Sequence, residues 1–226
     1  EPPFLLADRV ISIDAIPCSY GTGTIETETD ITNSAWYLIR NRMPAGIMIE
    51  AGQADLMLIS WLGADLLNQG KRVYRLLGCE LEYQNSLPKT GETLNYKIQI
   101  DSHAQHEDTR LFFFHYDCTI EDKKYLIVRN CQAGFFTYEE LANSKGIIWD
   151  PSSAGYRKDA QWDLPKVENP KHSFSEEEVR ACFLGDSYRC FGDRYKKIAT
   201  QNYPPIFANA HMQLIQRVEE FDPRGG

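Results

Sequence analysis

The sequence has no apolar run long enough to cross a bilayer. Spanning the hydrocarbon core takes about 20 consecutive apolar residues, and polar or charged residues interrupt every stretch well before that length. The first residues, Glu1-Pro2-Pro3-Phe4, have neither the basic region of a secretory signal nor a starting Met. We therefore expect a processed or excised piece of a cytoplasmic protein, with no membrane partner.

Positive charge is also scarce. The 32 Asp and Glu residues outnumber the 24 Lys and Arg residues, so the formal net charge is -8. Nucleic-acid binding depends on a basic patch that neutralises phosphates, and the sequence contains no such patch. We therefore expect no nucleic-acid partner.

Signatures of metal sites and disulfide frameworks are missing as well. The five histidines do not cluster with the six cysteines, which form no Cys-x-x-Cys pair and lie at positions 18, 79, 118, 131, 182 and 190. This spacing favours reduced, mostly buried thiols over a zinc site or a disulfide framework. No metal site is predicted, and no phosphate-binding loop or Ser-His-Asp signature is visible.

The sequence does contain a long apolar segment between two groups of strand-like segments. Residues 45–67 read AGIMIEAGQADLMLISWLGADLL and place apolar side chains on most sides of a helix, which must therefore be buried on most sides. Alternating or β-branched segments flank it at 8–16, 21–31, 72–83, 92–102, 109–120 and 124–137. Short connections favour antiparallel pairing. We predict an α+β, hot-dog-like fold, with one antiparallel sheet curled around a long central helix.

The pattern changes after residue 140. Residues 141–205 have little periodicity, apart from a predicted short helix with Ser175 as N-cap and Glu178 at the capping-box position. Residues 214–222 read LIQRVEEFD and repeat the pattern of residues 6–14, LADRVISID. We therefore predict a hot-dog at 1–140, a linker with one or more short helices at 141–205, and the start of a second, truncated hot-dog at 206–226.

Two motifs indicate a family. Residues 43–51, MPAGIMIEA, resemble the Met-Pro-Gly-x-x-x-x-(Asp/Glu)-Ala motif of the β-hydroxyacyl thioester dehydratases, which have the hot-dog fold, and residues 88–94, PKTGETL, are similar to that family's Pro-Gly-Asp turn. Residues 3–10 and 42–46 resemble, more narrowly, a dehydratase region of polyunsaturated fatty acid synthases, which are large multidomain proteins similar to polyketide synthases. The resemblance covers residues 4–137.

The resemblance implies a lyase that removes water from a β-hydroxyacyl chain carried on the phosphopantetheine of acyl carrier protein, with no other cofactor. In this family a His and an Asp or Glu from two different hot-dogs share the acid–base work, and a backbone N–H at the helix start stabilises the oxyanion. Glu50 matches the acidic position, and Ala45 and Gly46 match the substrate-binding helix start. The His position, eight residues before Pro44, holds Trp36, whose indole cannot abstract a proton.

Glu50 is also a candidate on physical grounds. A carboxylate in the first turns of an apolar helix is expensive to bury, and burial would raise its pKa toward the range of a general acid. The alternative is a Glu that only complements the helix dipole. His103 and His115 lie far downstream in a turn and a strand, where a lone His is typically packed or solvated.

We therefore expect the N-terminal half of a double hot-dog dehydratase that supplies the acid but not the His, and that is inactive or nearly so alone. Its expected partners are acyl carrier protein and a second hot-dog, from the same polypeptide or from a homodimer. Three alternatives stay open. They are a silent pseudo-dehydratase that supports a partner domain, a hot-dog thioesterase in which Glu50 activates water, and a scaffold that gathers acyl carrier protein. Like charges on this chain and on acidic carrier proteins argue against the scaffold.

Overall fold

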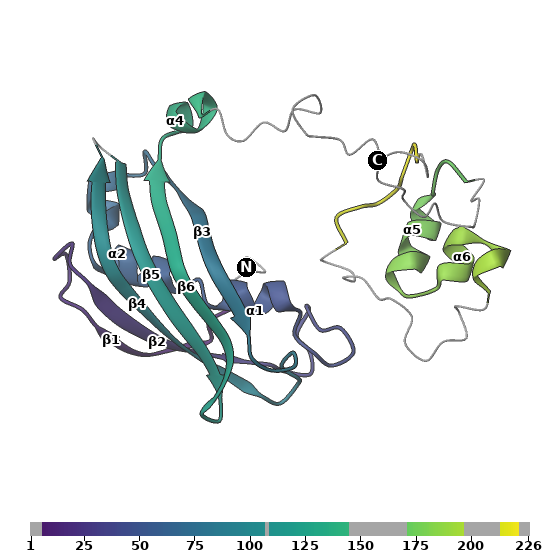
Figure 1. The fold of residues 1–226 in the computed structure, drawn as a ribbon, viewed down its shortest axis with the longest axis horizontal. Coiled ribbons are helices and arrows are strands. Elements are labelled where there is room, and N and C mark those ends of the chain that lie inside the picture. The colour runs from purple at the N-terminus through teal and green to yellow at the C-terminus, as the bar shows by residue number, and fades with distance from the viewer. Residues whose placement is uncertain (1–5, 107–108, 145–170, 197–212, 222–226) are drawn as a thin grey trace, which may run out of the picture. The chain divides into compact units, whose positions relative to one another are not determined.

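The computed structural model describes residues 6–106, 109–144, 171–196 and 213–221, which fall into two compact units, 1–146 and 147–226. The first unit is built on a six-stranded antiparallel sheet in the order β1-β2-β4-β5-β6-β3, which bends around the helices α1 and α2 (Figure 1). The strands are β1 (Arg9–Asp14), β2 (Gly23–Asp30), β3 (Val73–Tyr83), β4 (Thr93–His106), β5 (Thr109–Ile120) and β6 (Lys123–Phe136). This confirms the predicted hot-dog fold.

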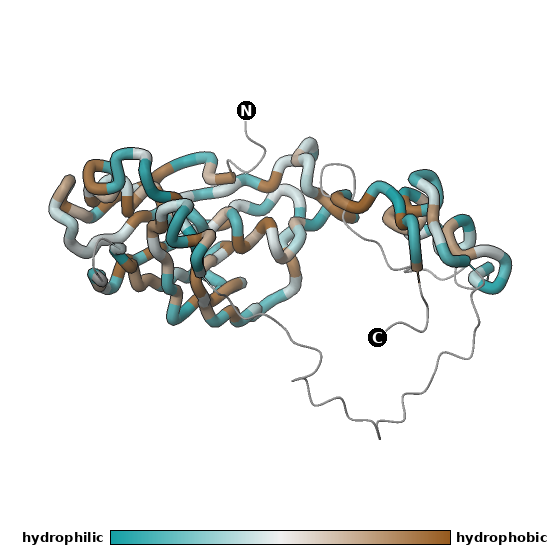
Figure 2. Tube along the Cα trace, turned by 90° about the horizontal axis from the view of Figure 1, so that it is seen from above, coloured by the Kyte–Doolittle hydropathy of each residue, from teal (hydrophilic) through white to brown (hydrophobic). Residues whose placement is uncertain are grey.

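The sheet forms because its strands alternate in polarity. Along β5, every second residue from Phe112 to Ile120 is buried, and the residues between them are half-exposed. Figure 2 shows hydrophobic and hydrophilic residues interspersed along the trace. This period of two places one face of an antiparallel strand on the core and leaves the other toward solvent, which is why the sequence located these strands to within a few residues.

The prediction of one continuous central helix was wrong. The segment folds as three short helices, α1 (Ala45–Ala51), α2 (Asp55–Trp61) and α3 (Ala64–Asn68). Both breaks contain a glycine. Gly63 has φ +104°, in the left-handed region that favours glycine, and Gly52 ends α1 where the sheet leaves no room for a side chain.

Substitution of Gly52 should destabilise the fold by a steric effect alone, because its backbone conformation is ordinary. A Cβ there would lie 2.6 Å from Cε2 of Tyr116, whose ring is 1% exposed and has no room to move. We expect Gly52→Ala to lower the free energy of unfolding by about 1–3 kcal/mol, as overpacked cores do, in urea titrations. Gly46→Ala is the matched control, since its Cβ would meet nothing within 4 Å; an equal loss there would contradict the steric account.

Tyrosine hydroxyls from the sheet fix the position of α1. The last four carbonyls of a helix have no N–H donor within the helix itself. In α1 the Tyr96 hydroxyl donates to one of them, the Met48 carbonyl, at 2.7 Å. The Tyr116 hydroxyl donates to the Ile49 carbonyl at 3.4 Å. Tyr96 and Tyr116 are 1% exposed, so α1 is held on rigid, buried side chains of β4 and β5.

The remaining helices lie after the sheet. In the first unit, α4 (Tyr138–Asn143) begins with a capping box formed by Thr137 and Glu140. In the second unit, α5 (Glu176–Phe183) has the capping box of Ser175 and Glu178 that the sequence predicts. α6 (Ser187–Phe191) and the short 3-10 helix η1 (Asp193–Tyr195) follow it. Among the described residues, no helix has the length and apolarity to span a membrane.

The predicted start of a second hot-dog stays a prediction. Its residues 206–212 and 222–226 lie outside the described residues, as do residues 145–170 and 197–205 of the predicted linker. Within the described part, Val218 forms an isolated antiparallel bridge with Phe174, with reciprocal N–H···O bonds of 2.8 and 2.9 Å. Phe174 packs there with Val179 and Cys190 in a small apolar cluster.

Candidate functional site

The two motifs of the sequence meet at the start of α1. The N–H of Met43 donates to the Pro88 carbonyl at 2.9 Å, and Arg42 forms an antiparallel bridge with Lys89. The Thr90 N–H donates to the Asn41 carbonyl at 2.9 Å. The turn before β4 therefore fixes the chain just before α1, so that the helix starts at a defined place.

The start of α1 carries unused hydrogen-bond donors. Pro44 is the N-cap and supplies no side-chain hydrogen bond, and the first turn contains no acidic residue. The first N–H groups of a helix have no intrahelical acceptor. A Cβ built on Gly46 would meet no atom within 4 Å, so the space beside the Gly46 backbone is open to a ligand. The open donors suit the predicted binding of a developing negative charge.

Glu50 lies in the last turn of α1 and is exposed. The chain by itself therefore leaves this carboxylate in water. Among the described residues, its side chain has no hydrogen-bond or ion-pair partner. The physical reason is that α1 is buried through Ile47, Met48 and Ala51, and Glu50 lies outside the stripe that these residues form.

Trp36 lies in an irregular segment before α1. Its ring packs edge-on against Tyr37, with centroids 5.6 Å apart, and Trp36 is half-buried. Tyr37 is buried, and desolvation raises its pKa to about 12. The position that matches the family's base thus holds a packed aromatic side chain.

The two histidines singled out in the sequence are engaged elsewhere. Nδ1 of His115 lies 2.8 Å from an Asp101 carboxylate oxygen, on the outer face of β5. His103 contacts the Gly21 carbonyl through Nε2, and its ring packs against Phe112 with centroids 4.6 Å apart.

Asp55, at the start of α2, is a candidate acid that the sequence interpretation missed. It is fully buried, and one carboxylate oxygen accepts a hydrogen bond from the Tyr74 hydroxyl at 3.0 Å. The other oxygen has no hydrogen-bond partner among the described residues. Desolvation raises the pKa of Asp55 to about 7, and the nearby charge of Glu50 adds to this effect.

A signal for Asp55 was present in the sequence. It lies at helical spacing with Met48, Ala51 and Leu58, all of which are buried. An acidic residue in the middle of an apolar stripe is expensive to bury. The family motif at residues 43–51 pointed to Glu50, and Asp55 lies outside that motif.

The sheet bends around short helices, and α1 has an open start and carries the acidic residue Glu50. These features define a hot-dog domain of the dehydratase-like class. The model of the FabA-like domain matches residues 1–129. The chain belongs to the FabA-like domain family.

The sequence is also similar to a much larger protein. It is 35% identical, over 231 residues, to one of the subunits of the polyunsaturated fatty acid synthase of Thraustochytrium sp. (strain ATCC 26185 / S-3). The alignment covers 99% of this chain and 15% of that relative. The chain therefore spans less than a sixth of the relative's length.

Solved structures with a similar arrangement have low sequence identity. The dehydratase heterocomplex ApeI:P of Xenorhabdus doucetiae aligns with a TM-score of 0.43 and 15% identity, covering 63% of this chain and 90% of that chain. The protein TT0310 of Thermus thermophilus aligns with a TM-score of 0.40 and 12% identity, covering 60% of this chain and 97% of that chain.

Proposed function

We propose that this chain supplies the acid half of a composite β-hydroxyacyl thioester dehydratase site, in fatty acid or polyketide synthesis. The observation that carries the proposal is the short helix α1, which has open N–H donors at its start and the exposed Glu50 in its last turn. The likeness to part of a polyunsaturated fatty acid synthase supports a substrate of the fatty acyl class.

In the proposed reaction, a His from a second hot-dog removes the α-proton of the substrate. The electron pair forms the new double bond as the β-hydroxyl leaves, and the Glu50 carboxyl gives that hydroxyl the proton that makes it water. The N–H groups of Ala45 and Gly46 stabilise the negative charge that develops on the thioester oxygen. Trp36 has no part in proton transfer. We propose that acyl carrier protein presents the substrate on its phosphopantetheine.

The exposure of Glu50 fits a site that two domains complete. Expelling water strengthens the electrostatic interactions inside an active site. A partner that covers α1 would remove the Glu50 carboxyl from water and enclose it with the substrate.

Strand β3 offers a surface for that partner. It is the last strand of the sheet order, so one of its edges has no neighbour in the sheet, and open edges are normally covered in native proteins. Leu77 is 52% exposed and Tyr83 42% exposed on this strand. The Tyr83 hydroxyl donates to the Ala45 carbonyl at 3.4 Å, which places the end of β3 beside the start of α1. A second hot-dog at this edge would thus lie next to the start of α1.

The test compares the chain alone with a polypeptide that continues into the next domain. Each is supplied with a β-hydroxyacyl thioester, and formation of the α,β-unsaturated product is followed by absorbance and mass spectrometry. We expect the 226-residue chain to be inactive or nearly so, because it lacks the base, and the longer polypeptide to turn over. Equal turnover by the two would contradict a composite site.

A silent supporting domain is the second candidate. The replacement of the family's His by Trp36 favours it, as does the absence of a partner for Glu50 among the described residues. In that case the longer polypeptide would dehydrate its substrate without any need for Glu50.

A further inference from the structure

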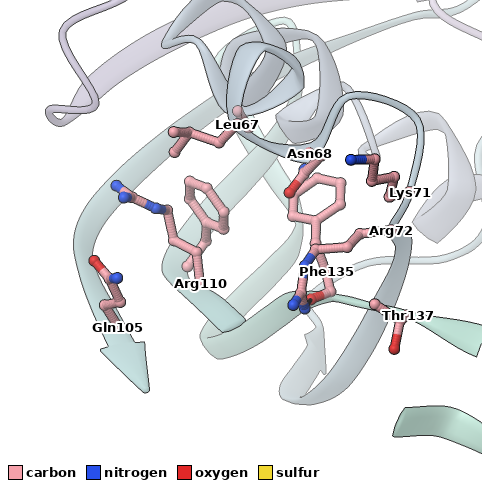
Figure 3. A pocket seen from close by; sticks show the side chains of 10 residues that line it. Leu67, Asn68, Lys71, Arg72, Gln105, Arg110, Phe135 and Thr137 are labelled. Atoms are coloured by element: carbon pink, nitrogen blue, oxygen red, sulfur yellow. Dashed lines mark hydrogen bonds between the residues drawn. The ribbon is translucent and has the colours of Figure 1, made fainter. Parts of the chain in front are cut away.

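A separate cavity lies where α3 leads into β3. Its volume is about 330 Å³, at the small end of the range for ligand sites. Figure 3 shows side chains from several elements around it. The residues that line it are Ala64, Leu67, Asn68, Lys71, Arg72, Gln105, Arg110, Phe112, Phe135 and Thr137.

Two aromatic rings form an apolar wall of this cavity. Phe112 and Phe135 are 1% and 8% exposed, and their centroids lie 5.8 Å apart in an edge-to-face arrangement. Leu67, in contrast, is 48% exposed at the mouth. The apolar part of a ligand could leave water by packing against this wall, and the side chains of the core would not have to move.

The charged side chains among the described lining residues are all cationic. They are Lys71, Arg72 and Arg110, although the chain has a net charge of -8. Arg72 is already engaged, because its guanidinium donates to Glu140 at 3.0 Å and to the Phe135 carbonyl at 3.1 Å. It therefore fixes α4 to the end of β6.

Lys71 and Arg110 keep their charge available. Within the described part of the chain, neither forms an ion pair. The Arg110 guanidinium lies over the Tyr20 ring, 5.1 Å from its centroid, a contact that orients the group and leaves N–H donors for a ligand. A partly enclosed cation gains most from an anionic group that it can hydrogen-bond.

We propose that this cavity binds a small amphiphilic anion, namely a carboxylate or phosphate group attached to an apolar body. The cationic side chains Lys71 and Arg110 hold the charged group, and the body rests on Phe112 and Phe135. A neutral amphiphile would leave the charges without a partner, and the cavity volume excludes a large polyanion. The site is distinct from the start of α1, so it does not depend on the proposed dehydration.

The test is calorimetric titration of the full 226-residue chain with octanoate, octyl phosphate and their neutral counterpart octanol. We expect at least one anion to bind about tenfold or more tightly than its neutral counterpart, and its affinity to fall with salt. Tighter binding of octanoate assigns a fatty carboxylate, and tighter binding of the phosphate assigns a phosphate ester. Equal binding of octanol and both anions, or no binding, overturns the proposal.

Variants locate the binding. The double variant Lys71→Gln, Arg110→Gln should weaken the anion about tenfold or more, and Arg110→Lys, which keeps the charge, should retain more affinity than Arg110→Gln. The matched control, Lys97→Gln with Lys123→Gln, removes the same charge from exposed positions outside the cavity. Equal weakening by the control would overturn the proposal, and unchanged unfolding midpoints show that the variants remain folded.

Discussion

In a polypeptide that contains both hot-dogs, Glu50→Gln is expected to lower the rate of dehydration by a factor of about 10² to 10⁴, the usual contribution of a positioned acid or base. Gln keeps the size of Glu50 but carries no proton that it can give to a leaving hydroxyl. The side chain is exposed in this chain and has no partner among the described residues, so the substitution should leave the fold intact. The loss would then report chemistry and not stability.

The measurement is single-turnover conversion of a β-hydroxyacyl thioester, with the unfolding midpoint followed in parallel. Glu139→Gln, at an exposed position of α4, is the control and should convert substrate at the parent rate. Full activity of Glu50→Gln would contradict the role of Glu50 as the acid and would favour the alternative of a silent supporting domain. Release of free thiol at the expense of dehydration would instead indicate a thioesterase.

The fold could be predicted because the signals were local. The alternation along β5 and the turn residues between strands depend on neighbours in the sequence, and these fixed the strands. The register from Pro44 to Glu50 likewise located the helix start. The glycine breaks were harder to foresee, because Gly52 ends α1 through a close approach of Tyr116, 64 residues further along the chain by the numbering.

The exposure of Glu50 could not be predicted for the same reason, whereas the helical spacing of Asp55 with buried apolar residues was a signal for its burial. Which side of a short helix is buried depends on where the helix ends. Here α1 ends at Ala51, and α2 begins at Asp55 as a separate helix. Asp55 is thereby buried against Tyr74, and Glu50 is left in solvent.

The buried Asp55 should make stability depend on pH. Its pKa rises from the ordinary value of 3.8 to about 7 in the folded state, so the folded state binds a proton that the unfolded state has released. The stabilising effect of that proton is complete below about pH 4 and is lost as pH rises to about 7. A shift of about three units corresponds to a loss on the order of 4 kcal/mol across this window.

We expect Asp55→Asn to remove this dependence. Asn does not ionise, so the difference in free energy of unfolding between the variant and the parent should move in favour of the variant by about 2–4 kcal/mol from about pH 4 to about pH 8. The amide group adds a buried donor at every pH, with a cost of about 1–3 kcal/mol. The informative quantity is therefore the change of this difference with pH, measured by urea titration, and not its value at one pH.

Two further variants separate Asp55 from other groups. Tyr74→Phe removes the hydrogen bond that lowers the pKa of Asp55. The loss of stability should therefore begin at the same pH and extend to a higher pH than in the parent. Asp122→Asn, in the exposed turn between β5 and β6, should follow the parent profile at every pH. If Asp55→Asn also follows the parent profile, then Asp55 is ionised in the folded state, and a partner for its second carboxylate oxygen must exist. Such a partner would have to enter the core beside Tyr74, where the described residues offer none.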